Sequence, residues 1–135
     1  MVVDTSVLVA IYLEEPGQDT FVDLIDAADE AAVSVVSRFQ TMSVLCSRRF
    51  GVGRATVETF LDALGLDLVA VSVAQMERAI SGMVTFGKGR HPARLNFGDC
   101  FAYGLAAELR TTFLFKGDDF ALTDVTPARR PEPTS

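Results

Sequence analysis

Short apolar segments that favour β-strands alternate with longer amphipathic segments along this 135-residue chain. The apolar segments end near residue 4 and lie at 33–36, 67–72 and 111–115, with a further short one at 122–125. Strands separated by helices pair in parallel, and a parallel sheet is buried under helices on both faces. The alternation therefore predicts an α/β fold, an α/β/α sandwich around a short parallel sheet of about four to five strands, the last at an edge.

Capping signals divide the amphipathic segments into helices. Ser37 is expected to cap a helix that ends at Gly51, and Gln40 fits the reciprocal position of a capping box with Ser37. Ser72 is expected to cap another helix, which runs to Phe86, in the same way with Gln75. Further helices are expected directly after residue 4 and at 18–31, 54–65 and 97–110.

Length and composition fit a single domain, because 49% hydrophobic residues can supply a core. We expect the domain to span residues 1–126 and the polar, Pro-rich residues 127–135 to form a flexible tail. Mean hydropathy is +0.28, but no apolar run approaches the roughly 20 residues of a membrane helix, and we expect no signal peptide because MVVDTS lacks a basic segment and a cleavage site. Cys46 and Cys100 lie in apolar helical patterns, as expected for buried free thiols of a cytoplasmic protein.

Charge is segregated along the chain, so the net charge of −6 is a poor guide to any one face. The first 30 residues hold eight acids and no Lys or Arg, whereas residues 31–57 hold four arginines and no acid. Residues 78–98 again lack acids and hold a basic cluster: Arg78, Lys88, Arg90, His91 and Arg94. Each basic segment could be a nucleic-acid contact or an ordinary solvated surface.

Acidic residues occur where a parallel sheet places its functional sites, outside the carboxyl ends of the strands. Asp4 ends the first strand, and Asp99 lies at the start of a late helix. Asp118 and Asp119 follow the last long apolar segment. Helix-dipole and turn preferences could explain the late acids, but a carboxylate in an apolar strand is costly unless it is paired or binds a cation. Together the acids predict a site for a hard divalent cation, which could activate water or hold a phosphodiester.

Other catalytic patterns are missing from the sequence. There is no P-loop, no GxSxG motif and no cysteine with a plausible histidine partner. His91 lies in the basic loop, where it is more readily explained as a solvated or ligand-facing residue than as a general base.

Three stretches, in order and at family-like spacing, resemble PIN-domain ribonucleases, and most closely the VapC-type toxins of bacterial toxin–antitoxin modules. They are VVDTSVLVAIYLEEP, GKGRHPARLNFGDCFAYGLA and LFKGDDFALTDV, and the similarity runs from Val2 to about Val125. The resemblance implies a Rossmann-like PIN domain and an endoribonuclease that hydrolyses RNA by metal-activated water. It also implies Mg²⁺ or Mn²⁺ as cofactor, a cognate VapB-like antitoxin as partner, and a homodimer.

The resemblance also assigns roles to single residues. The family's motif aspartates match Asp4, Asp99 and Asp119, which are therefore expected to be catalytic and to bind the metal. Thr5 and Ser6 match the hydroxyl pair beside the first aspartate and are expected to contact the substrate. Asp118 is a neighbour that could assist, and the number of metal ions stays open.

Gln40 departs from the family pattern, which has a glutamate at the matching catalytic position. An amide oxygen can still accept hydrogen bonds and bind a hard cation weakly, but the side chain lacks the negative charge. We therefore expect Gln40 to weaken metal binding and to lower cleavage by about 10–100-fold. An alternative is a PIN-fold protein with reduced or lost catalysis that mainly binds an antitoxin or RNA.

The basic loop before the late helix is the expected RNA contact. Lys88, Arg90 and Arg94 could bind phosphates near the metal site. Arginines earlier in the chain could extend this surface: Arg48, Arg49 and Arg54. Such contacts position RNA without reading its sequence, so the target RNA does not follow from them.

Two other classes share parts of the pattern. A haloacid-dehalogenase-type phosphatase also pairs an early aspartate with a late GDD, but it needs a second aspartate where this chain has Ser6. A receiver domain needs a late lysine, which Lys116 could supply, but its strand order fits poorly.

Overall fold

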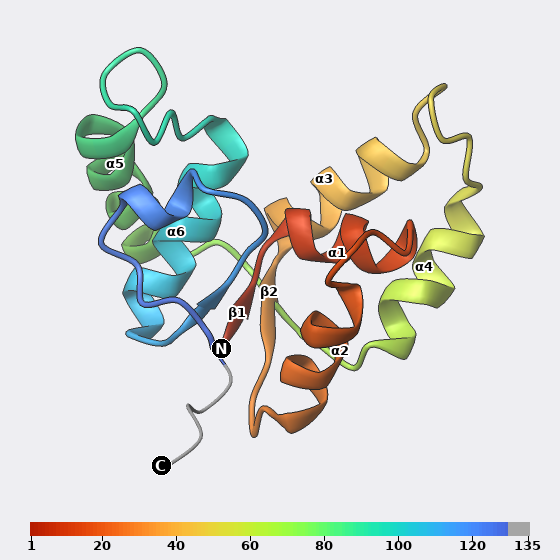
Figure 1. Cartoon of the computed structure of the whole chain (residues 1–135). Coiled ribbons are helices and arrows are strands. Elements are labelled where there is room, and N and C mark those ends of the chain that lie inside the picture. Colours follow the sequence, from red (N-terminus) through yellow and green to blue (C-terminus); the bar gives the residue numbers. More distant parts are fainter. Residues whose placement is uncertain (130–135) are drawn as a thin grey trace.

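The computed structural model describes residues 1–129, which form a central sheet between two layers of helices (Figure 1). The described residues contain four parallel strands in the order β3-β2-β1-β4. Their bounds are β1 Val2–Val3, β2 Ala32–Ser34, β3 Asp67–Val69 and β4 Phe113–Leu114. The predicted α/β fold with a short parallel sheet is confirmed.

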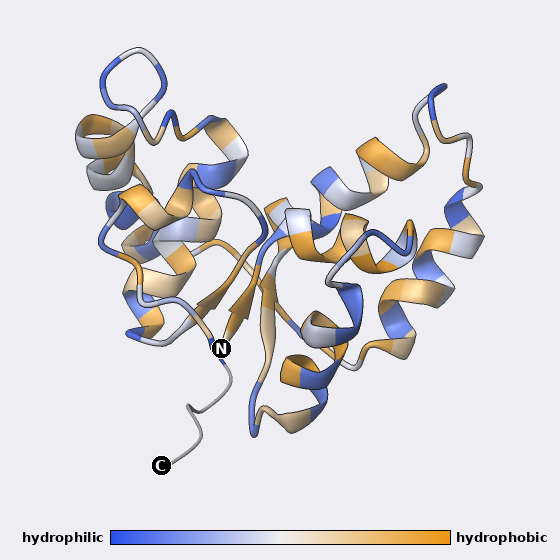
Figure 2. Ribbon diagram, in the orientation of Figure 1, coloured by the Kyte–Doolittle hydropathy of each residue, from blue (hydrophilic) through white to orange (hydrophobic). Residues whose placement is uncertain are grey.

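Helices cover both faces of the sheet. One layer holds α1 (Thr5–Tyr12), α2 (Gln18–Ala27), α3 (Val35–Leu45) and α4 (Arg54–Ala63), and the other holds α5 (Val73–Phe86) and α6 (Phe97–Leu109). Side chains of a strand alternate between these layers. Val2 and Phe113 belong to the core under α5 and α6, whereas Val3 and Leu114 belong to the core under the other four helices. The strands β1 and β4 are accordingly apolar (Figure 2).

The expected fifth strand is wrong. Residues 122–125 form no strand, and a short 3₁₀ helix, η1 (Phe120–Leu122), follows β4 instead. The edge of β4 is paired further along the chain, where Phe113 N–H donates to the Thr126 carbonyl at 2.8 Å and Ala128 N–H donates to the Phe113 carbonyl at 2.9 Å. The predicted tail begins at residue 127, and its residues 130–135 lie outside the described residues.

The start of α3 also differs from the prediction. Ser34 is the N-cap, because its Oγ accepts the Val36 N–H at 3.1 Å, and Val35 and Val36 are helical. Ser37 is therefore a buried residue inside the helix, and its Oγ has no hydrogen-bond partner among the described residues. The β-branched residues around Ser34 favour a strand, so the sequence did not predict this cap. Because Ser37 is not the N-cap, the expected capping box with Gln40 does not exist. The helix also ends at Leu45, well before Gly51.

The cap of α5 is partly as predicted. Ser72 Oγ accepts the Gln75 N–H at 3.1 Å, which confirms Ser72 as the N-cap. Gln75 does not complete the capping box, because its Nε2 donates to the Ala70 carbonyl at 3.0 Å.

The two cysteines differ in exposure. Cys100 is buried in the core under α5 and α6, as predicted. Cys46 is exposed, so the prediction of a buried thiol is wrong there. The helical pattern placed Cys46 inside a long helix, whereas it lies just after the end of α3.

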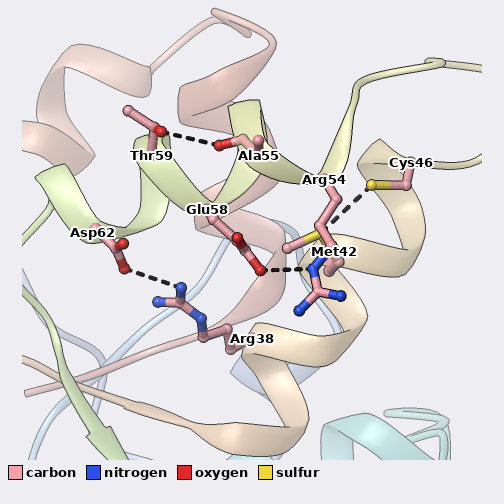
Figure 3. Close-up of polar contacts among 8 residues, drawn as sticks. All are labelled: Arg38, Met42, Cys46, Arg54, Ala55, Glu58, Thr59 and Asp62. Carbon is pink, nitrogen blue, oxygen red and sulfur yellow. Dashed lines mark hydrogen bonds and ion pairs between the residues drawn. The ribbon is translucent and has the colours of Figure 1, made fainter.

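Acids of α4 neutralise part of the arginine-rich segment. Arg38 Nη2 lies 3.0 Å from Asp62 Oδ1, which joins α3 to α4, and Arg54 Nε lies 2.8 Å from Glu58 Oε1 (Figure 3). Arg38 thus pairs with an acid on the next helix, whereas Arg54 pairs with an acid one turn later on its own helix. In the described part of the chain, no helix has the length and apolar character needed to cross a membrane.

Candidate active site

A cavity of about 680 Å³ opens at the carboxyl ends of β1 and β4. In the sheet, β2 and β3 lie on one side of β1, and β4 lies on the other side. The boundary between β1 and β4 is therefore the topological switch point, where open parallel sheets bind ligands. The polar lining consists of Asp4, Thr5, Ser6, Glu15, Gln40, Ser43, Asn96, Asp99 and Lys116.

Asp4 is the buried carboxylate of this cavity, with 4% exposure. It is also the N-cap of α1, where its Oδ2 accepts the Ser6 N–H at 3.0 Å. Burial raises the pKa of Asp4, and hydrogen bonds from Ser6 and Thr5 only partly oppose that effect. Among the described residues no cation pairs with it, so its negative charge is stabilised only by hydrogen bonds and the helix dipole.

Asp99 reaches the cavity from the first turn of α6. Its Oδ2 accepts the Asn96 N–H at 3.0 Å, and Asn96 Oδ1 accepts the Asp99 N–H at 2.9 Å, so the two residues form a capping box. Burial is the main cause that raises the pKa of Asp99 to about 6, and the charges of Asp4 and Asp119 raise it further. The site therefore holds a carboxylate that takes up a proton near neutral pH when no cation is present.

Asp119 and Asp118 occupy a different position. Both are exposed after β4, and neither lines the cavity. Asp119 is close enough to raise the pKa of Asp99, whereas no such effect involves Asp118. The structure thus brings Asp4 and Asp99 into one cavity and places Asp119 near its edge.

Gln40 enters the cavity from the second turn of α3. Its Oε1 is 3.2 Å from Thr5 Oγ1, whose hydroxyl also lies 3.1 Å from the Ser37 carbonyl. The amide packs against Gly98 of α6, where a β-carbon would lie 1.9 Å from Gln40 Nε2. Gly98, a neighbour of Asp99, therefore leaves the space that Gln40 fills. The sequence predicted Gln40 in the site but gave no indication of this contact.

Ser6, Lys116 and Glu15 form a second polar network at the cavity wall. The Lys116 N–H donates to Ser6 Oγ at 2.9 Å, which fixes the end of β4 to α1. The Lys116 ammonium is 2.5 Å from Glu15 Oε2, in the turn between α1 and α2. Sequence reasoning did not place Lys116 or Glu15 in this site, because they are 101 residues apart and their contact depends on the fold.

The oxygen donors of the cavity fit a hard divalent cation. Asp4 and Asp99 supply two carboxylates and Gln40 an amide oxygen, and Mg²⁺ commonly uses one or two carboxylates together with water. Burial is the main cause that raises the pKa of both acids, and the charges of Asp4 and Asp119 add to the effect at Asp99. No group of three or more His, Cys, Asp or Glu side chains in residues 1–129 is arranged to hold an ion alone, so water or substrate would have to complete the shell.

The basic loop lies apart from the cavity lining. Lys88 borders a mainly apolar cavity between α5 and α6, and Arg90 and Arg94 are exposed. None of the three lines the acidic cavity. Their expected contact with RNA stays a prediction, and it would have to occur outside the cavity.

Comparisons with known proteins find relatives that are named ribonucleases. Ribonuclease VapC30 from Mycobacterium tuberculosis is 40% identical over 131 residues, covering 97% of the chain and 100% of the relative. Ribonuclease VapC from Mycolicibacterium smegmatis is 39% identical over 125 residues, covering 93% and 97%.

Solved structures support the fold. VapC20 of M. tuberculosis, described as a sarcin-ricin loop cleaving toxin, has a TM-score of 0.66 at 18% identity and covers 93% of the chain and 98% of its own. A toxin–antitoxin complex from Klebsiella pneumoniae gives 0.66 at 15% identity and covers 89% of both chains. The PIN domain family matches residues 1–125. The chain therefore belongs to the PIN-domain family, among its VapC-type members.

Proposed function

We propose that the protein is an endoribonuclease toxin that hydrolyses RNA phosphodiester bonds with Mg²⁺ or Mn²⁺. The observation that carries the proposal is the pair of carboxylates in one cavity, Asp4 and Asp99, each with a raised pKa and without a cationic partner among the described residues. The VapC relatives are named ribonucleases, which supports RNA as the class of substrate.

The side chains of the cavity would have different roles in such a site. A divalent ion bound there would supply Lewis-acid activation of water and of the phosphodiester. Asp4 and Asp99 would hold the ion, and the helix N-termini they occupy fix their oxygens in place and partly offset the burial that raises both pKa values. The Thr5 hydroxyl can donate to the Gln40 amide oxygen at 3.2 Å and so helps to orient the amide. Asp119 adds negative charge at the edge of the site.

Gln40 reduces the affinity for the ion in this proposal. It stands where the family pattern has a glutamate but brings no negative charge, so two carboxylates, Asp4 and Asp99, rather than three would surround the ion. The same residue favours the second candidate function, a PIN-fold protein that binds an antitoxin or RNA and cleaves slowly or not at all. Measured cleavage separates the two.

We also propose a cytoplasmic toxin whose activity is blocked by a cognate VapB-like antitoxin. The support is the naming of the relatives and the toxin–antitoxin complex among the structural neighbours. The homodimer stays a prediction that light scattering of the free chain would test.

The decisive experiment measures cleavage of single-stranded and stem-loop RNA by the purified chain with Mn²⁺, with Mg²⁺ and with a chelator. We expect metal-dependent cleavage, and products without 2′,3′-cyclic phosphate ends because water rather than the 2′-hydroxyl attacks. Asp99→Asn is the matched control, since it keeps the capping shape but removes the charge, and it should abolish cleavage. Cleavage that persists in chelator or in Asp99→Asn would overturn the assignment.

A further inference from the structure

Lys116 carries the one positive charge among the described residues that line the acidic cavity. The same lining holds three carboxylates, Asp4, Glu15 and Asp99, so an approaching RNA phosphate meets net negative charge. A polyanion therefore needs a cationic contact there in addition to any metal ion. Lys116 is the side chain placed to provide it.

The ammonium group of Lys116 is held away from the other two acids. It lies 2.5 Å from Glu15 Oε2, and no ion pair joins it to Asp4 or Asp99 in residues 1–129. Its backbone is fixed independently, because the Lys116 N–H donates to Ser6 Oγ at 2.9 Å. Ser6 in turn donates its own N–H to Asp4 Oδ2 at 3.0 Å. The lysine is thus anchored next to the metal-holding acids without neutralising them.

The ion pair can exchange partners at low cost. The side chains of Lys116 and Glu15 are 35% and 36% exposed, so water can solvate Glu15 when the ammonium leaves. Partly exposed pairs of this kind are weak. A phosphate oxygen can form a charge-assisted hydrogen bond with the same ammonium.

We propose that Lys116 binds a phosphate of the RNA substrate beside the metal-holding acids, and that Glu15 is a positioning residue that holds the ammonium at the cavity wall until RNA binds. The proposal rests on the ribonuclease function proposed above and names a binding residue for it. An ordinary structural ion pair is the competing explanation, and it predicts a small loss of stability with no effect on RNA.

The test measures RNA binding as a function of salt. Fluorescence anisotropy of a labelled single-stranded RNA would be recorded over a range of NaCl concentrations, in chelator and in an Asp99→Asn background that prevents cleavage. Lys116→Met should weaken binding about tenfold and reduce the slope of log K against log salt by about 0.7, the value for one phosphate contact on single-stranded RNA. Lys116→Arg should retain both. Thermal unfolding of each variant checks that it is folded.

Two further variants separate a specific contact from general charge. Arg129→Met removes an exposed charge beside Met1 at the start of β1, outside the lining of the acidic cavity, and should leave the slope unchanged. Glu15→Gln should tighten binding severalfold by releasing Lys116, and this gain should vanish when Lys116→Met is also present. A gain that persists in the double variant would show that Glu15 does not act through Lys116.

The outcomes also separate this proposal from the function on which it rests. If the unmodified chain fails to cleave RNA with Mn²⁺, the ribonuclease function is wrong. If it cleaves RNA but Lys116→Met binds with an unchanged salt slope, or if Arg129→Met changes the slope equally, only the role of Lys116 is overturned.

Discussion

The contact between Gly98 and Gln40 offers a way to move one site side chain without changing its chemistry. A β-carbon at position 98 would lie 1.9 Å from Gln40 Nε2 and 2.3 Å from its Oε1. These atoms form the end of a flexible side chain, so in Gly98→Ala the amide moves while the backbones of α3 and α6 stay in place. Gln40 then leaves the space beside Asp99.

The expected cost in stability is small. Moving Gln40 removes its hydrogen bond from Thr5 Oγ1, and one such bond contributes about 1 kcal/mol. Alanine in place of glycine stabilises the helical conformation of α6 by up to about 1 kcal/mol. The free energy of unfolding should therefore change by about 1 kcal/mol or less, whereas loss of a supporting oxygen should weaken metal binding about tenfold.

Mn²⁺ titration and thermal unfolding of four proteins would check this reasoning. They are the unmodified chain, Gly98→Ala, Gln40→Ala and the double variant. We expect all three variants to lose Mn²⁺ affinity equally, because each removes the same oxygen and the double variant has nothing more to lose. Unchanged affinity in a folded Gly98→Ala protein would refute the role of the Gln40 oxygen, and an additional loss in the double variant would show that Gly98 acts independently.

Three more results are expected. Gln40→Glu should increase Mn²⁺ affinity and RNA cleavage by about 10–100-fold, and equal rates would show that this side chain does not support catalysis. Without metal, the stability that Asp99 contributes is fully present below its unfolded pKa near 4 and is lost as pH rises through about 6, so Asp99→Asn should stabilise the chain more at pH 7.5 than at pH 4 in denaturant titrations. Gly82→Ala places a β-carbon 2.5 Å from the Tyr103 ring and should lower the free energy of unfolding by about 1–3 kcal/mol, which thermal unfolding would detect.

The sheet and the positions of Asp4 and Asp99 were predictable, because they depend on the local sequence pattern and on the rule for where parallel sheets place their sites. Alternating strands and helices require a parallel sheet, and such sheets place functional groups at the strand ends. Asp4 follows β1 and Asp99 begins α6, so both could be assigned to one edge before their separation in space was known. The position of Asp99 in the first turn of α6 was likewise expected, whereas its capping box with Asn96 was not predicted.

Other features depend on tertiary contacts that no local pattern encodes. The run of β-branched residues around Ser34 favours a strand, yet the hydroxyl of Ser34 begins α3 there, so the helix starts three residues earlier than expected. The space for Gln40 comes from Gly98 on another helix. The pairing of Lys116 with Glu15 similarly joins two turns that are adjacent only in the folded chain.

Anomalous diffraction from Mn²⁺-soaked crystals of the chain tests the central claim most directly, because it locates the ion without reference to activity. The account predicts an anomalous peak within coordination distance of the carboxylates of Asp4 and Asp99, and its loss in crystals of Asp99→Asn. A peak elsewhere, or a peak at this cavity that persists in Asp99→Asn, would contradict the proposal that these two acids hold the ion.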